Sequence, residues 1–371
     1  MKILCNLASL STTHKAMLLI YSPVVTNRLT YIFDLIFREL LGLEFRITSL
    51  TDEFTAWTDP KINYSGTNPG NGLYFRASGI LFENTIVDQK IDVVILNGSL
   101  VFYAHSDASS VLPFDPFAAA FYMVSRYEEY LPFESDKYDR FDPSTSIAYK
   151  NKFLQTPVVN KWALQIKEAL QSRYPGILFR PSAYRFIPTI DIDHAYAYLY
   201  RKFYRVFGSY GRSFIRGDWK DVLLRTQVLL GSHKDPYDNY SWMESIHQPH
   251  QLVALYFILF ADYGGNDNNV TTRKEGFHKL IRLLDKNSSV GIHPSLSSTK
   301  HFSRLTSEIH HLEHVLQRKI VASRQHFLKV RLPKTYRDLI ETGITDDYSM
   351  GYASVPGFRA GIVNSDRKSV V

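Results

Sequence analysis

The sequence has almost no cysteine, since Cys5 is the only one among 371 residues. An intrachain disulfide needs two cysteines and a thiolate zinc cluster needs more, so both are excluded. Any metal ion must therefore be bound by His, Asp or Glu. The shortage of cysteine also fits a reducing compartment.

Long apolar runs are missing too. No stretch reaches the roughly 18 consecutive apolar residues that a membrane-spanning helix requires, and the longest candidate, residues 252–260, has the length of a strand. Residues 1–17 lose their apolar character between Ser9 and Lys15, which makes a poor signal peptide. We expect no transmembrane segment and a cytoplasmic location, and we interpret residues 1–16 as a tail or the product of an upstream start.

Apolar and aromatic residues are abundant, at 45% and 14% of the chain. Such a composition excludes disorder as a general description, and the length favours two domains. The formal charge of +7 is spread along the chain, and its densest basic stretch, residues 201–220, interleaves Arg and Lys with aromatic residues. A nucleic-acid or membrane-surface contact is one interpretation. We favour a solvated helix face with aromatic anchors beneath it and expect no nucleic-acid partner, because no recognition motif accompanies the stretch.

The first half of the chain predicts a small α/β domain over residues 17–178. An apolar strand at 18–21 precedes a helix whose apolar residues, from Leu29 to Leu41, recur every three or four positions. Strands are predicted at 43–47 and, buried, at 92–97, with a loop at 58–72. Asp115 and Pro116 predict the start of a helix over 117–130. Its charged residues Arg126, Glu128 and Glu129 are interpreted as a structural network.

After a break at residues 174–176, strands and helices alternate, which predicts a mostly parallel sheet or barrel. Polar side chains follow several of these strands: Asp191, Asp193 and His194 after an apolar run, and His293 after another. In parallel α/β folds the chemistry collects at the carboxyl ends of strands. A carboxylate pair with a histidine suits a divalent metal, although strand-end Asp and His are also common structural residues.

The ordered series of these motifs resembles the polysaccharide deacetylase superfamily, in a two-domain branch typical of Bacteroidetes-type bacteria. The series comprises Thr189-x-Asp191-x-Asp193, Gly291-x-His293-Pro294-Ser295, Arg324-Gln325-His326-Phe327, Asp347-x-x-x-Gly351-Tyr352 and Gly357-Phe358-Arg359-Ala360-Gly361, with Pro113-Phe114-Asp115-Pro116-Phe117 and Ser125-Arg126-Tyr127-Glu128-Glu129-Tyr130 in the first half. The resemblance runs from about Met17 to Gly361. It implies that residues 179–361 form a distorted (β/α) barrel of the polysaccharide deacetylase type, preceded by the smaller α/β domain.

The same resemblance implies a metal-dependent hydrolase that removes an acetyl group from an acetylated sugar or polysaccharide, with a divalent cation, zinc by preference, as cofactor. It assigns Asp191 as the general base, Asp193 and His293 as metal ligands, Arg324 as the arginine that orients the base, and Asp347 as an acidic residue that positions its partners.

The chain departs from the family pattern at two places. Ser297 stands where the second metal histidine is expected, so a substitute is needed: His326 is the first choice and His194 the second. We interpret His310 and His314 as part of a solvated helix face. The late Leu-x-x-His segment that supplies the general acid is absent, and the polar residues 362–371 resemble a truncation scar, so we expect an incomplete barrel. These departures motivate an alternative, a non-catalytic carbohydrate-binding or scaffold protein on a decayed deacetylase barrel.

Overall fold

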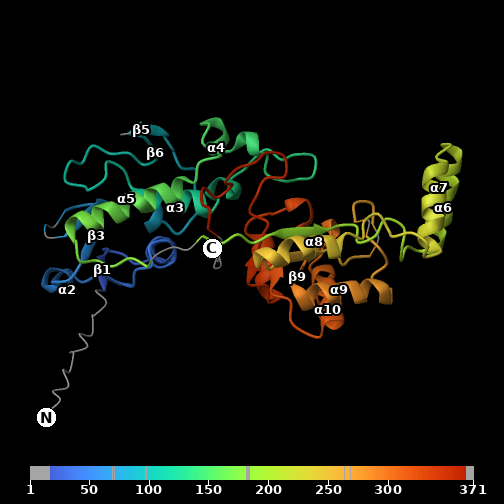
Figure 1. The fold of residues 1–371 in the computed structure, drawn as a ribbon. Coiled ribbons are helices and arrows are strands. Elements are labelled where there is room, and N and C mark those ends of the chain that lie inside the picture. Colours follow the sequence, from blue (N-terminus) through green and yellow to red (C-terminus); the bar gives the residue numbers. More distant parts are fainter. Residues whose placement is uncertain are drawn as a thin grey trace, which may run out of the picture. The chain divides into compact units, whose positions relative to one another are not determined.

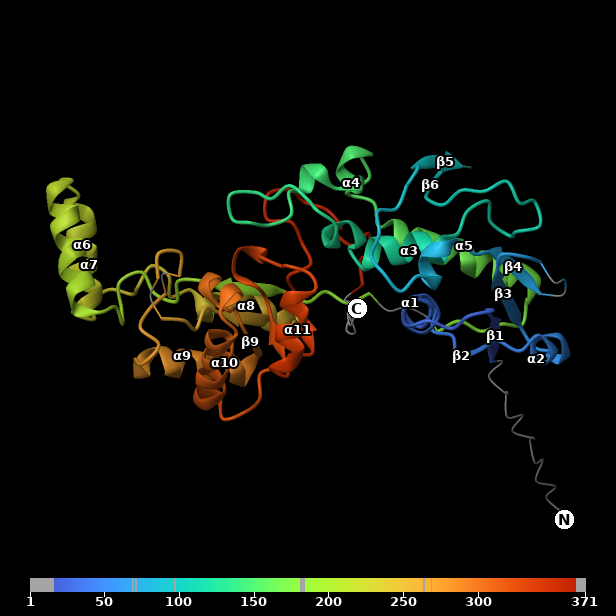
Figure 2. The same ribbon diagram turned by 180° about the vertical axis from the view of Figure 1, so that it is seen from behind.

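The computed structural model describes residues 17–68, 70, 72–96, 98–180, 184–262, 264–267 and 269–364. Described residues of Met1–Leu131, Thr156–Ala183 and Ala360–Asn364 form one compact unit, unit 1, and those of Pro132–Gln155 and Tyr184–Arg359 form unit 2. Both units are α/β, and both are drawn in Figures 1 and 2. None of the helices in the described ranges is long and apolar enough to cross a membrane. Of the predicted tails at 1–16 and 362–371, residues 1–16 and 365–371 lie outside the described residues.

Unit 1 is built on a four-stranded parallel sheet in the order β2-β1-β3-β4. Its elements are β1 (Leu18–Tyr21), α1 (Asn27–Phe33), the π-helix Asp34–Leu40, β2 (Phe45–Thr48), α2 (Thr51–Ala56), β3 (Lys61–Ser65), β4 (Leu73–Arg76), the antiparallel pair β5 (Val94–Leu96) and β6 (Ser99–Val101), α3 (Pro116–Val124) and α5 (Val158–Arg173). The start of α1 is capped by Thr26, whose hydroxyl accepts the N–H of Leu29. Gly42 follows the helical segment with φ of +65°.

The predicted loop at 58–72 is wrong, because it contains β3, an inner strand of the sheet. Ile62 and Tyr64 are fully buried there, as an inner strand requires. Lys61 is buried as well, and its ammonium group donates to the carbonyl oxygens of Phe54 and Trp57 at the end of α2, at 2.8 and 2.7 Å. Asn63, one of the polar residues that suggested a loop, is satisfied as well, since it donates to the carbonyl oxygen of Thr67 and accepts from the hydroxyl of Ser65. Pro69 and Asn71 lie outside the described residues.

Two further predictions for unit 1 need correction. The strand predicted at 92–97 is β5, but it is not buried, since Ile95 is 74% exposed; Asn97 lies outside the described residues. The helix predicted over 117–130 begins as expected, with Asp115 accepting two backbone N–H groups, yet α3 ends at Val124. Arg126 then adopts a left-handed conformation with φ of 56°.

Arg126 lies at the centre of a buried ion-pair network, as predicted. Its side chain is 1% exposed, and its guanidinium donates to Glu129 at 2.8 Å and to Glu128 at 2.7 Å. The Glu129 side chain is 2% exposed. Backbone hydrogen bonds from Ser125 and Arg126 close the last turn of α3, and the ion-pair network fixes the turn that follows.

Unit 2 contains a five-stranded parallel sheet in the order β11-β10-β9-β8-β7. Its elements are α4 (Ile147–Lys150), β7 (Thr189–Ile192), α6 (Phe203–Ile215), α7 (Trp219–Leu229), α8 (Tyr240–His247), β8 (Leu255–Ile258), α9 (Glu275–Asn287), β9 (Ser289–Ile292), α10 (Phe302–Leu316), β10 (Ala322–Ser323), α11 (Lys334–Glu341) and β11 (Asp346–Asp347). The strands follow one another across the sheet in chain order, so the predicted alternation and parallel pairing are confirmed.

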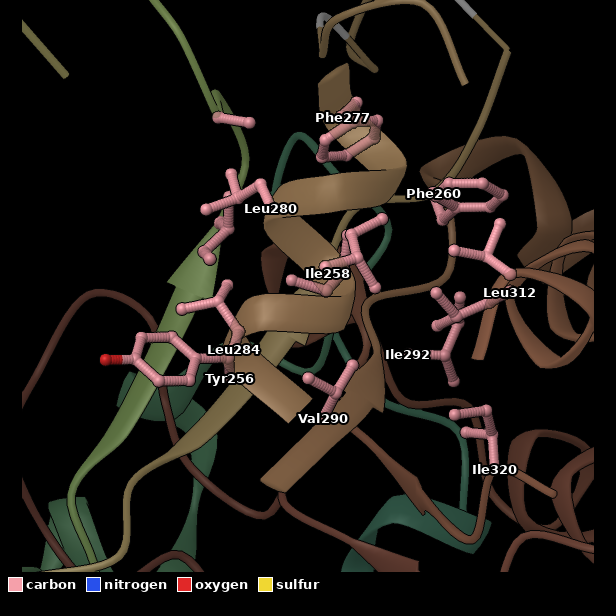
Figure 3. Close-up of a cluster of buried hydrophobic side chains, with 14 of the residues drawn as sticks. Tyr256, Ile258, Phe260, Phe277, Leu280, Leu284, Val290, Ile292, Leu312 and Ile320 are labelled. Carbon is pink, nitrogen blue, oxygen red and sulfur yellow. The ribbon is translucent and has the colours of Figure 1, made fainter. Parts of the chain in front are cut away.

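A hydrophobic core covers this sheet. Figure 3 shows Phe277, Leu280 and Leu284 of α9 directed toward the side chains of the neighbouring strands. Ile258 and Ile292, from adjacent strands, have no exposed surface. A side chain at Gly291 would meet the Phe257 ring and the carbonyl oxygen of the next strand at under 3 Å, so glycine is required between them. The core thus fixes β7 to β10 side by side, with their carboxyl ends at one edge.

Residues 132–155 belong to unit 2, although residues 156–183 of unit 1 separate them in the chain from the rest of it. The Tyr138 ring stacks on the Phe327 ring with centroids 4.9 Å apart, and Arg140 donates to the carbonyl oxygen of Phe327 at 2.6 Å. Asp136 in turn accepts from Arg140. This segment therefore supports the chain that follows β10.

The basic stretch 201–220 lies mostly in the hairpin formed by α6 and α7, which projects from the sheet of unit 2 in Figures 1 and 2. The prediction that its aromatic residues are buried anchors is wrong. Phe203 is 77% exposed, Phe214 64% and Trp219 60%.

Candidate metal centre

Three polar side chains that are far apart in the sequence converge at the carboxyl edge of the parallel sheet of unit 2. Asp193 follows β7, His293 follows β9, and His326 lies three residues beyond β10. One ligand atom from each lies within 4.8 Å of the ligand atoms of the other two. Parallel strands end at the same edge of a sheet, so their positions after the strands bring the three residues together.

The carboxylate of Asp193 lies at the centre of this group. Its Oδ1 is 3.2 Å from Nε2 of His293 and 3.8 Å from Nε2 of His326. The neighbouring His293 holds the pKa of Asp193 below its ordinary value, so the carboxylate is ionised at neutral pH. The same Oδ1 is buried and has no hydrogen-bond partner in the described part of the chain. A buried anionic oxygen of this kind calls for a cation.

The hydrogen-bond partner of Nδ1 in each imidazole determines which ring nitrogen carries the proton and what Nε2 presents to Asp193. Nδ1 of His293 lies against the carbonyl oxygen of Arg324, and Nδ1 of His326 lies 2.9 Å from Oδ1 of Asp267. Both partners only accept hydrogen bonds, so each Nδ1 carries a proton and donates it. When an imidazole is neutral, its Nε2 presents a lone pair toward Asp193. When His293 is protonated, its Nε2–H instead donates to the carboxylate, which is the interaction that lowers the pKa of Asp193.

This arrangement fits a divalent metal ion. Two imidazole lone pairs and one carboxylate are ligands that zinc accepts, and ligands about 2.0–2.2 Å from a tetrahedral ion lie about 3.3–3.5 Å from one another. The 3.2 and 3.8 Å separations around Asp193 are close to that spacing. Metal-bound histidines typically donate their second N–H to a carboxylate or a backbone carbonyl, and both histidines do so here. The residues therefore suit three protein ligands with at least one open position.

Asp191 and Arg324 form a second polar group at this edge. The guanidinium of Arg324 donates to Oδ1 of Asp191 at 2.9 Å and to the Thr189 hydroxyl at 2.7 Å, both on β7. It also lies over the Phe257 ring, 4.7 Å from its centroid. Because Nδ1 of His293 donates to the backbone carbonyl of Arg324, this residue connects Asp191 to a candidate metal ligand.

Asp347 lies further from the three candidate ligands in this hydrogen-bond network. Its carboxylate accepts from the hydroxyls of Ser323 at 2.7 Å and Ser349 at 2.9 Å, and Ser349 accepts the backbone N–H of Gln325. Burial raises the pKa of Asp347, although these hydrogen bonds and the positive charge of Arg324 oppose the rise. Asp347 thus organises the backbone on both sides of Arg324.

The remaining candidates lie outside the group of three. His194 is exposed and is not one of its members, so the structure brings together the first choice for the third ligand, His326. Ser297 hydrogen-bonds to Ser295 and to Arg304. His310 and His314 are exposed on α10, so the prediction of a solvated face is confirmed.

Two acidic residues next to the site were missed from the sequence. Asp267 is 4% exposed and accepts hydrogen bonds from His326 and from the backbone N–H of Leu296. Burial alone would raise its pKa, but these hydrogen bonds outweigh it and hold the pKa below its ordinary value. The only sequence signal for Asp267 is the polar loop after the apolar run 252–260, in which it lies several residues beyond the end of β8.

Glu308 is the second missed residue. Its carboxylate accepts the N–H of Ser295 at 2.9 Å and the hydroxyl of Ser295 at 2.6 Å, and it borders a polar cleft of about 410 Å³. Burial raises the pKa of Glu308 to about 7. The carboxyl group of Glu308 therefore changes charge near neutral pH. Its hydrogen bonds to Ser295 fix the loop that begins at His293.

The raised pKa of Glu308 predicts a pH-dependent stability. Between its ordinary pKa of 4.5 and about 7, the folded state binds more protons than the unfolded state, so the free energy of unfolding falls as the pH rises through this range. Glu308→Gln can keep both hydrogen bonds with Ser295 but cannot ionise. We expect Glu308→Gln to reduce this pH-dependent decrease in the free energy of unfolding by up to about 3 kcal/mol. Urea unfolding of both proteins at several pH values measures the difference.

Glu313→Gln, on the same helix, reports the general effect of removing one negative charge. If the difference in unfolding free energy between Glu308→Gln and the unsubstituted protein were constant from about pH 5 to about pH 8, a raised pKa of Glu308 would be excluded.

Comparisons with known proteins concern only part of the chain. No curated protein and no solved structure matches it. Residues 18–175 match a family described as a family of unknown function, DUF7033. The matched residues carry the four parallel strands of unit 1 and helices α1, α2, α3 and α5, and none of the three candidate metal ligands lies among them.

Proposed function

We propose that unit 2 is a metal-dependent hydrolase that removes an acetyl group from an acetylated sugar or polysaccharide, in carbohydrate metabolism or envelope polysaccharide synthesis. The observation that carries the proposal is the convergence of Asp193, His293 and His326 beside the pair of Asp191 and Arg324. The ordered strand-end motifs of the sequence support the same class of enzyme. The five parallel strands in chain order are compatible with a distorted (β/α) barrel, which is part of the proposal.

In this mechanism Asp193, His293 and His326 hold a divalent cation, zinc by preference. When bound, such an ion polarises an acetyl carbonyl and lowers the pKa of water. Asp191 takes the proton from the attacking water as general base and returns it to the sugar nitrogen or oxygen when the bond to the acetyl group breaks. Arg324 keeps the Asp191 carboxylate in place through its 2.9 Å hydrogen bond, and the cation–π contact with Phe257 restricts the guanidinium. Asp347 fixes the backbone around Arg324 and acts as a positioning residue.

Acetate release tests the proposal. The purified protein is assayed with N-acetylated and O-acetylated oligosaccharides, and its metal content is measured by mass spectrometry. We expect a divalent metal to copurify. Asp191→Asn should lower the rate of acetate release by about 10²–10⁴-fold, because it removes a general base, while retaining the metal.

Asp346→Asn is the matched control, since Asp346 lies on β11 next to the site and hydrogen-bonds to Thr345. Its rate should stay close to that of the unsubstituted protein. An Asp191→Asn variant with unchanged activity would contradict the role of Asp191.

The alternative, a non-catalytic carbohydrate-binding protein, is supported by Ser297, whose hydroxyl is engaged by Ser295 and Arg304 in place of a histidine ligand. Glycan binding that survives both chelation and Asp191→Asn, without acetate release from any acetylated glycan, would support this alternative over the hydrolase.

A further inference from the structure

The α6–α7 hairpin of unit 2 has its polar groups on the inside. Asp221 of α7 accepts hydrogen bonds from Ser213 of α6 at 2.5 Å and from Tyr198 at 2.7 Å, and it forms an ion pair with Arg225. The guanidinium of Arg225 also lies over the ring of Tyr198, 5.1 Å from its centroid. A hairpin in water normally buries apolar side chains between its helices, so this polar seam is the reverse of the usual pattern.

Large apolar side chains cover the outside of the same hairpin. We call this set the apolar stripe: Phe203, Phe207 and Phe214 of α6, and Trp219, Leu223 and Leu230 on and just after α7. Their exposed fractions are 77%, 58%, 64%, 60%, 60% and 79%. At about 100° per residue, the three members on each helix fall within about 40° of one another. The Phe214 and Trp219 rings, 5.0 Å apart, join the two rows at the turn.

Basic side chains are numerous on the same hairpin, on the parts of its surface outside the apolar stripe. The stretch 201–220 contains six Arg or Lys residues and one acidic residue, Asp218. Lys202, Arg212, Arg216 and Lys220 are exposed, and we call these four the basic rim. A polar face rich in cations, together with another face of aromatic and aliphatic side chains, is the composition of helices that lie in the headgroup region of a membrane.

We propose that the α6–α7 hairpin binds the surface of a membrane that contains anionic lipids. The apolar stripe enters the boundary between headgroups and acyl chains, and the anionic surface attracts the basic rim. The hairpin lies on the surface and does not cross the membrane. This role is independent of the metal centre and would place unit 2 next to membrane-associated molecules.

The charges and the side-chain types favour lipid over other occupants. Residues 201–220 carry a net positive charge, so two copies of the hairpin packed stripe to stripe would place like charges near one another, which is unfavourable. A single-stranded nucleic acid would use the aromatic rings for stacking, but Leu223 and Leu230 offer no ring to a base. Aliphatic and aromatic side chains are equally suited to acyl chains.

Sedimentation with lipid vesicles tests the proposal on the full chain. Vesicles of phosphatidylcholine with about one third phosphatidylglycerol should bind the protein at low salt, and pure phosphatidylcholine vesicles should bind it at least about tenfold more weakly. Raising the salt should weaken binding to the anionic vesicles. Phe207→Ser with Phe214→Ser, and separately Arg212→Glu with Arg216→Glu, should each lower binding by about tenfold or more.

Matched controls lie elsewhere on unit 2. Lys279→Glu with Lys286→Glu makes the same charge change on exposed positions of α9 and should reduce binding less than the Arg212 and Arg216 pair does. Trp242→Ser removes another exposed aromatic, 62% exposed on α8, and should bind as the unsubstituted protein does. Asp193→Ala should also bind fully, which separates this proposal from that of the metal centre. Circular dichroism confirms that each variant is folded.

A fluorescence measurement avoids any doubt about folding. The emission of the protein should shift to shorter wavelength on anionic vesicles, and Trp219→Phe should abolish that shift while vesicle binding persists. The proposal is overturned by absence of binding to anionic vesicles, or by equal binding of the stripe variants. If the protein does not bind vesicles but forms a dimer that the stripe variants dissociate, the hairpin binds a second copy of the chain. If it does not bind vesicles but retains single-stranded nucleic acid, the hairpin binds nucleic acid.

Discussion

His326→Ala is expected to remove the divalent metal from the purified protein, whereas His194→Ala is expected to leave it bound. His326 presents Nε2 toward Asp193, 3.8 Å from its Oδ1, and completes the group of three ligands. His194 is an exposed neighbour in the sequence and is not part of that group. Loss of one ligand out of three leaves two, which bind zinc poorly. Asp193→Ala and His293→Ala should have the same effect as His326→Ala.

Metal content by mass spectrometry and zinc titration by calorimetry measure this result. Asp267→Asn adds a graded test, because Asp267 holds the tautomer and orientation of His326 without being one of the three ligands. We expect about 10–100-fold weaker metal affinity for it, rather than complete loss. Metal retained by both Asp193→Ala and His293→Ala would exclude the centre altogether, and loss in His194→Ala but not in His326→Ala would assign the third ligand to His194.

Arg126→Met should cause a large loss of stability, in unit 1. The substitution keeps most of the side-chain volume but removes the cation that pairs with Glu129, whose side chain is 2% exposed. A buried carboxylate left without its partner typically costs about 3–5 kcal/mol. The free energy of unfolding of unit 1 should fall by about that amount, which hydrogen exchange at the amides of β1 and β3 can follow separately from unit 2.

Arg46→Met is the matched control for the loss of one guanidinium. Arg46 also pairs with a glutamate, Glu53, but its side chain is 47% exposed. Exposed pairs contribute about 0–1 kcal/mol, so the control should be nearly as stable as the unsubstituted protein. Equal decreases in the free energy of unfolding for Arg46→Met and Arg126→Met would show that the buried ion pairs contribute no more to stability than the exposed pair.

The order of elements in unit 2 could be predicted from the sequence, and so could the residues that meet at its edge. Apolar runs of strand length alternate with helical spacing, and the polar residues that follow the runs include Asp193, His293 and His326. Parallel pairing brings these residues close together in space, because it places the carboxyl ends of the strands at one edge of the sheet. Asp267 and Glu308 escaped notice because they lack that pattern: the first lies several residues beyond β8, and the second lies in the middle of α10.

Prediction failed where polar residues are buried or apolar residues are exposed. Lys61 begins an inner strand, because its ammonium finds the free carbonyl groups at the end of α2, a partnership between segments that composition cannot reveal. The opposite error concerns Phe203 and Trp219, interpreted from the sequence as anchors beneath a solvated helix face because no recognition motif accompanies the stretch. Spacing shows that a helix has an apolar face, but it does not identify what covers that face.

Each unit is discontinuous in the chain, and this limits how the protein can be divided. Residues 132–155 fall inside the matched range 18–175, yet Tyr138 and Arg140 contact Phe327, one residue beyond a candidate metal ligand. A C-terminal fragment that starts after residue 178 would lose these contacts, and an N-terminal fragment would carry them without their counterpart. During synthesis, this segment leaves the ribosome well before the residues it packs against, so unit 2 completes its packing only after Phe327 has emerged.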